Sequence, residues 1–139
     1  MVRACLRVAV FAPVLLLGAA AQAACGDSLG TAGRHLSDGD SLKIAYVPRI
    51  WPVPVGRHFA LDIEVCSPPP GSRPLLLRVD ADMPAHKHGM NYRPSVTALE
   101  PGRYRAEGLM FHMPGTWRLQ FEVRENAATL RSSSTLEVQ

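Results

Sequence analysis

The sequence of 139 residues lacks most features that mark the large functional classes. It has no Gly-rich phosphate loop, no Cys-x-x-Cys pair, no internal repeat and no Ser, His and Asp spacing typical of a hydrolase. Its longest apolar run, residues 8–21, is shorter than the roughly 20 residues that a membrane-spanning helix needs. We therefore expect a single domain with no catalytic residues, which is not an enzyme and does not insert into a membrane.

An excess of one charge is also missing. The chain carries 15 Lys and Arg against 12 Asp and Glu, a formal net charge of +3. Two of the basic residues, Arg3 and Arg7, lie in the first 23 residues, which contain no acidic residue, so 13 basic and 12 acidic residues follow. A remaining charge of about +1 gives no electrostatic reason to expect binding to nucleic acid or to an anionic membrane.

The beginning of the chain has the three parts of a secretory signal peptide. The two arginines are followed by the apolar run at 8–21 and by the small-x-small triplet at 21–23. We predict a signal peptide at 1–23 and one mature domain at 24–139. The mature protein is expected to be soluble in the periplasm or secreted.

Cysteine is rare after the expected signal peptide, where only Cys25 and Cys66 remain. Two cysteines in an oxidising compartment most simply pair, and closing a loop of about 42 residues would stabilise the fold by about 4 kcal/mol. Thiol ligation of a metal is the alternative, but neither cysteine has a His beside it. A lipid anchor on Cys25 is a second alternative, although Gln22 stands where a lipid-attachment signal has an aliphatic residue. We predict a structural disulfide.

Proline and glycine interrupt the mature chain so often that no amphipathic helix pattern has room to form. Between these turns, apolar and polar residues alternate with the period of two that is typical of half-buried β-strands. About seven such strands favour an all-β, two-sheet β-sandwich. The pattern predicts strands at 42–46, 59–65, 75–79 and 117–123, and weaker candidates at 95–99, 103–110 and 130–138.

Histidine and methionine gather in one part of the chain. Three of the five His and four of the five Met lie within residues 83–113. If the first part of this segment is extended, His86 and His88 point to the same side about 7 Å apart, which lets both imidazoles bind one ion. Gly89 would then permit a sharp turn that brings the sulfur of Met90 to the same ion.

A second group of candidate ligands surrounds Phe111. One alternation places Phe111 in the core and turns His112 towards the first group, while the Pro-Gly turn that follows lets Met113 take either side. Imidazole and thioether together suit copper, because thioether favours Cu(I) and imidazole binds both Cu(I) and Cu(II). The carboxylates of Asp80 and Asp82 leave a zinc or mixed site as an alternative.

The sequence around both groups resembles the YtkA-like domain family of small exported bacterial proteins. The resemblance rests on Met-Pro-Ala-His-Lys-His-Gly-Met at 83–90 and Phe-His-Met-Pro-Gly-Thr-Trp at 111–117, and it extends over about 75–125. It implies an immunoglobulin-like sandwich of about seven strands. It implies a fold more directly than an activity.

Related exported sandwich domains, such as the CopC-like copper carriers, bind copper through His and Met, although this chain lacks their acidic and N-terminal His pattern. We interpret the chain as an exported protein that holds a copper ion, as Cu(I) or Cu(II), or transfers it to a copper-receiving partner. The competing hypothesis is an accessory module without metal, whose loop at 83–94 contacts a membrane-protein partner. The ligands carried over by the resemblance are His86, His88 and Met90, with His112 or Met113 from the neighbouring turn.

Overall fold

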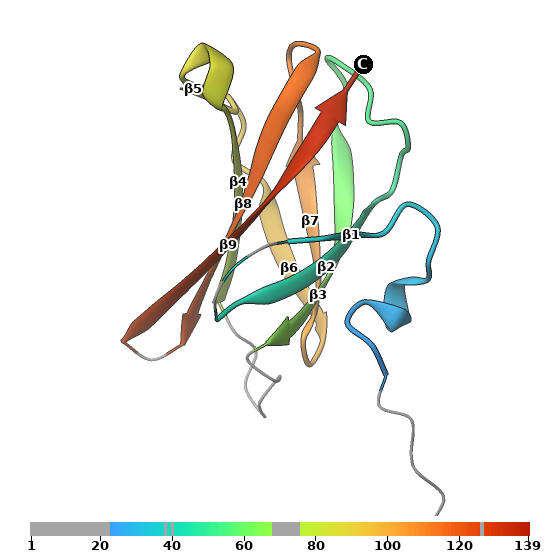
Figure 1. Ribbon diagram of the computed structural model, residues 1–139, viewed down its shortest axis with the longest axis vertical. Helices are drawn as coiled ribbons and strands as arrows, with labels where there is room; N and C mark the ends of the chain where they lie inside the picture. Colours follow the sequence, from blue (N-terminus) through green and yellow to red (C-terminus); the bar gives the residue numbers. More distant parts are fainter. Residues whose placement is uncertain (1–22, 38, 40, 68–75, 126) are drawn as a thin grey trace, which may run out of the picture.

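The computed structural model describes residues 23–37, 39, 41–67, 76–125 and 127–139 (Figure 1). Residues 1–22 of the signal peptide expected at 1–23, and Leu75 at the start of one predicted strand, lie outside the described residues. The described chain is almost entirely β-structure, with two short 3-10 helices, η1 (Asp27–Leu29) and η2 (Pro84–His86). Neither of these described helices is long and apolar enough to cross a membrane.

The strands form two antiparallel sheets that pack face to face (Figure 1). This confirms the predicted all-β sandwich, and its architecture is immunoglobulin-like. The first sheet has the order β1 (His35–Leu36), β2 (Lys43–Pro48), β3 (Phe59–Ser67), β7 (Arg103–Leu109) and β6 (Ser95–Glu100). The second sheet has the order β5 (His88–Gly89), β4 (Leu76–Met83), β8 (Gly115–Glu125) and β9 (Ala128–Val138).

All seven predicted strands are present, with bounds that differ by a few residues. Strands β1 and β5 were not predicted, because two residues are too few to show an alternating pattern. Each of them lies at the edge of its sheet. The alternation of apolar and polar residues therefore predicted every described strand that is long enough to show it.

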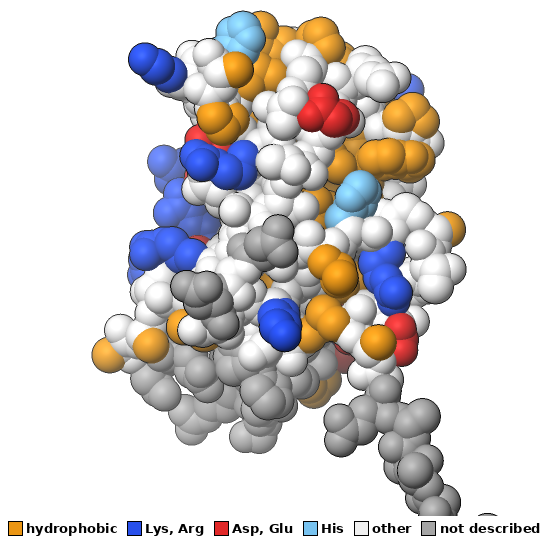
Figure 2. Space-filling model, viewed as in Figure 1, with side chains coloured by type: hydrophobic (Ala, Val, Ile, Leu, Met, Phe, Trp, Pro, Cys, Tyr) orange, Lys and Arg blue, Asp and Glu red, His pale blue; other side chains and the backbone are white. Residues whose placement is uncertain are grey.

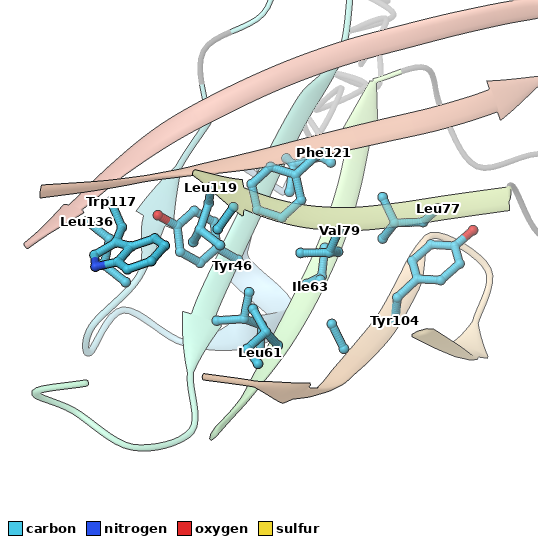
Figure 3. Packing of buried hydrophobic residues seen from close by; sticks show 14 of the residues in the cluster. Tyr46, Leu61, Ile63, Leu77, Val79, Tyr104, Trp117, Leu119, Phe121 and Leu136 are labelled. Carbon is cyan, nitrogen blue, oxygen red and sulfur yellow. The ribbon is translucent and has the colours of Figure 1, made fainter. Parts of the chain in front are cut away.

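The core fills the space between the two sheets (Figure 3). In β8 the apolar residues Trp117, Leu119 and Phe121 are buried, while Arg118 and Gln120 between them are exposed. This is the pattern of a strand with one face on the core and one in water. The other strands contribute inward-facing side chains that include Tyr46, Leu61, Ile63, Leu77, Val79, Tyr104 and Leu136.

A disulfide joins Cys25 to Cys66, as predicted. Their Cα atoms are 5.5 Å apart, and the bond ties the segment before η1 to the last residues of β3. Disulfides persist in oxidising compartments, so this bond fits an extracellular or periplasmic protein.

Three connections between strands meet at one end of the sandwich, where η2 and β5 project in Figure 1. The backbone N–H of Gly56 donates to the carbonyl of Phe111 over 2.7 Å. The rings of His58 and Tyr92 meet edge to face with centres 5.0 Å apart. These contacts bring together the connections at 49–58, 84–94 and 110–114.

Candidate functional site

The chain does not leave β4 in the extended conformation expected from the sequence. Pro84 begins the single 3-10 turn η2, which ends at His86, and Lys87 then adopts a left-handed conformation with φ of 55°. Proline favours the first position of such a turn, because its φ is already close to the helical value and it has no N–H to donate. The predicted extended path of His86 and His88 is therefore wrong, and the chain reverses at Lys87.

The turn expected at Gly89 is also corrected. Gly89 lies in β5, where His88 pairs with Met83 and Gly89 pairs with Asp82 of β4. The next residue, Met90, donates its backbone N–H to the carbonyl of Ala81 over 2.8 Å. Because Lys87 has already reversed the chain, the residues after it return along β4.

The three histidines nevertheless lie in a row, although they come from two separate segments. The ring centre of His88 is 5.8 Å from that of His86 and 4.9 Å from that of His112. Strands β4 and β8 are antiparallel neighbours, with Asp82 paired to Arg118, so the chain after β4 lies beside the chain before β8. We call His86, His88 and His112 the histidine row.

The spacing of the histidine row fits two imidazoles bound to one ion. An imidazole nitrogen lies about 2.0 Å from a bound metal, so two imidazoles on one ion have ring centres roughly 4 to 6 Å apart. Both measured separations, 5.8 Å and 4.9 Å, are within that range. His88 is the ring common to both pairs.

The side chains of the histidine row are accessible to solvent to different degrees. His86 and His112 are exposed and His88 is half-buried, and a histidine side chain lies at the surface of this end of the molecule in Figure 2. The Nδ1 atom of His88 is 3.3 Å from the carbonyl oxygen of Gly89. A carbonyl only accepts, so this contact favours the proton on Nδ1 and leaves Nε2 of His88 to bind a metal.

The thioethers occupy the boundary between the core and this surface. Met90 and Met113 are half-buried and pack against the hydrophobic core, whereas Met83 is a core residue with 1% of its surface exposed. Phe111 is fully buried and His112 is exposed, which is the alternation expected from the sequence. Methionine has three rotatable side-chain bonds, so the sulfur of Met90 or Met113 can turn outward without a change of backbone.

Carboxylates do not complete the histidine row. The described residues contain no group of three or more His, Cys, Asp and Glu side chains close enough to hold a metal ion. Asp80 pairs with Arg78 over 3.2 Å, and Asp82 accepts hydrogen bonds of 2.8 Å from Nε of Arg118 and from Gln120. The hydrogen bond from Arg118 is the main reason that the pKa of Asp82 lies below its ordinary value. Both carboxylates proposed for zinc are thus bound by arginine.

Comparison with known proteins bears on this same segment. Residues 75–122 match the YtkA-like family. This confirms the resemblance, and the matched range contains every candidate metal ligand. No curated protein matches the chain.

One solved structure is similar to this chain over most of its length. It is the crystal structure of a DUF4426 family protein from Pseudomonas aeruginosa PAO1, with 12% identity and a TM-score of 0.50. The likeness covers 76% of this chain and 94% of the other. At such low identity it shows a shared fold alone.

Two residues of the site were not recognised from the sequence. Lys87 makes the reversal that brings His88 back beside β4, and a lysine gives no sign that it will adopt a positive φ. Trp117 begins the predicted strand at 117–123 and is buried, but its ring also contacts both His88 and His112. Its position two residues after the Pro-Gly turn was the only signal in the sequence that it lies near the ligands.

Proposed function

We propose that this protein is exported and holds a copper ion at the histidine row, from which it passes the ion to a partner. The observation that carries the proposal is the 4.9 Å separation of the rings of His88 and His112, which belong to different segments of the chain. Two imidazoles this close to each other can bind one ion together. The proposed role is binding and transfer rather than catalysis.

The donor set supports copper. His88 and His112 form the proposed pair of ligands, and the thioether of Met90 or Met113 at the edge of the core is the candidate third ligand. His86 lies beside His88 but would have to move to bind the same ion. Imidazole binds copper in both oxidation states and the soft thioether favours Cu(I). Zinc would be served better by thiolate or carboxylate. In this protein the two cysteines form a disulfide and the nearby carboxylates are bound by arginine.

Exposure of the row suits transfer. His86 and His112 are open to solvent, so a His or Met of a partner can enter the coordination sphere as one of these ligands leaves. The ion then moves by stepwise replacement of ligands and is never released to water. A surface loop on a rigid sandwich provides such access.

The test is a titration of the metal-free protein with Cu(I) in the presence of a competing chelator, and separately with Cu(II). We expect one copper per chain, and a loss of affinity of at least about tenfold in the double variant His88→Ala/His112→Ala. The control is His58→Ala, which removes an exposed histidine from the same end of the molecule. Equal and weak binding by all three proteins would overturn the proposal.

An accessory module without metal is the second candidate. The observation that favours it is the exposure of large apolar side chains in the connections at this end, with Ile50 and Tyr92 each 40% exposed and Trp51 54% exposed. Exposed apolar residues of this size are typical of binding surfaces. A module of this kind would bind a membrane-protein partner equally well after the double histidine substitution, whereas its binding would weaken with Tyr92→Ser.

A further inference from the structure

Trp117 lies beneath the histidine row and is fixed in place by the core. It is the third residue of β8 and has none of its surface exposed. Its indole stacks on Phe111 with ring centres 4.6 Å apart and an angle of 20° between the planes. Its Nε1–H donates to the backbone carbonyl of Met113 over 3.0 Å. Stacking and this hydrogen bond together define both the position and the rotation of the indole.

Two of the three histidines rest against this fixed ring. The ring centre of His88 is 5.7 Å from that of Trp117, and the ring centre of His112 is 5.4 Å away. The angles between the planes are 62° and 80°, the edge-to-face geometry that aromatic rings favour. Among the described residues, His86 makes a ring contact with His88 and none with Trp117.

We propose that Trp117 is the positioning residue of the site and holds the rings of His88 and His112 at a fixed separation before any metal arrives. Its hydrogen bond to Met113 extends this control to the turn that carries a candidate thioether. The role in metal binding rests on the proposed copper function, whereas the fixed positions of the two rings can be measured in the metal-free protein. Fixing ligands in advance strengthens metal binding, because less side-chain freedom is lost when the ion binds.

The proposal also separates the roles of the three histidines. His88 and His112 are preorganised by Trp117, whereas His86 is exposed and its one ring contact among the described residues is with His88. We infer that the metal enters between His88 and His112 and that His86 joins last. His86 is then the first ligand to leave when a partner takes the ion.

The first arm of the test uses the metal-free protein. We expect the imidazole proton resonances of His88 and His112 to be displaced from their ordinary positions by the indole ring current, with nuclear Overhauser contacts to Trp117. His86 should lack such contacts. In Trp117→Leu both displacements should vanish, and in the control Phe121→Leu, a buried aromatic of the same strand, both should remain. Unchanged resonances in a folded Trp117→Leu protein would overturn the proposal.

The second arm measures copper affinity. Trp117→Phe keeps an aromatic ring in the core but cannot donate a hydrogen bond to the carbonyl of Met113. Because this variant preserves most of the core packing, it replaces Trp117→Leu in the test if the leucine variant does not fold. We expect Trp117→Phe to bind copper about tenfold more weakly than the wild type, as for other residues that orient metal ligands, and Phe121→Leu to bind it normally. Equal copper affinity in the wild type and in Trp117→Phe would overturn the positioning role of Trp117 but would not contradict the proposed copper site. If the wild type binds no copper but its His88 and His112 resonances are displaced, the proposed copper function is overturned, whereas the positioning of the two rings by Trp117 is supported.

Discussion

Among the described residues, histidine meets tryptophan in two regions that are built in opposite ways. In the histidine row the tryptophan, Trp117, is fully buried and the imidazoles reach towards solvent. In the second region Trp51 is 54% exposed and covers His35, whose Nε2 is buried without a hydrogen-bond partner among the described residues. The ring centres there are 5.1 Å apart, slightly closer than the 5.7 Å and 5.4 Å between Trp117 and the two histidines of the row. The same pair of residue types can thus present an imidazole or conceal it.

The difference follows from what lies on the other side of each ring. His35 stacks on Tyr46 with ring centres 5.2 Å apart, so it is enclosed between two aromatic rings. Burial lowers its pKa, because the charged form loses solvation. His112 and His88 instead have each other as neighbours. A metal-binding histidine needs another ligand beside it, and of these two regions the histidine row satisfies this condition.

The largest expected effect is a difference in stability between variants of the two tryptophans. Trp117→Ala should lower the free energy of unfolding by about 3 to 5 kcal/mol, because it leaves a cavity in the core. Trp51→Ala should lower it by less than about 1 kcal/mol, since half of its surface already faces water. Chemical denaturation of both variants measures the difference. Similar losses would show that Trp51 is packed as firmly as Trp117.

A smaller effect concerns the disulfide, which constrains the chain before His35 but does not involve the histidine row. Cys25→Ser/Cys66→Ser should lower the free energy of unfolding by about 2 to 4 kcal/mol, because the unfolded chain gains freedom. Copper affinity of the folded double variant should stay unchanged. Denaturation with and without a reductant checks the first expectation, and a chelator competition checks the second. A loss of copper binding in the folded variant would contradict the separation of the two regions.

The pH dependence of stability should come in part from His35. Its pKa in the folded protein lies below its ordinary value of 6.5, so at intermediate pH the unfolded chain binds a proton that the folded chain does not. The free energy of unfolding should therefore fall as the pH decreases through 6.5. His35→Phe should reduce this dependence, and denaturation on both sides of that pH measures it. An identical dependence in both proteins would mean that His35 is not shielded from solvent.

The smallest expected effect concerns Asp82, which pairs with Gly89 in the strand that carries His88. Arg118 holds the pKa of Asp82 below its ordinary value of 3.8, so the ion pair stabilises the fold at neutral pH and is lost as the pH falls below that value. The pair is partly exposed, so Asp82→Asn should cost less than about 1 kcal/mol at neutral pH. The wild type and the variant should become equally stable in acid. A larger loss, accompanied by weaker copper binding, would indicate that Asp82 supports the row.

Much of the fold could be predicted because the signal is local. Alternation along Phe59 to Val65 and along Trp117 to Val123 shows which side chains face the core, whatever their partners are. With Cys5 assigned to the expected signal peptide, the two remaining cysteines allowed only one pairing. The reversal at Lys87 could not be predicted, because a positive φ at a lysine depends on the contacts that hold the turn and not on the residue itself.

The sequence by itself determined the β-class, the disulfide and the candidate ligands, because each depends on residue type or on spacing along one segment. The tertiary structure decided which candidates meet. His88 and His112 are neighbours because β4 and β8 pair antiparallel, and Trp117 contacts both because β8 begins beneath them. Strand order and register are set by packing across the whole core, so contacts between distant segments cannot be obtained from the local pattern of any one strand.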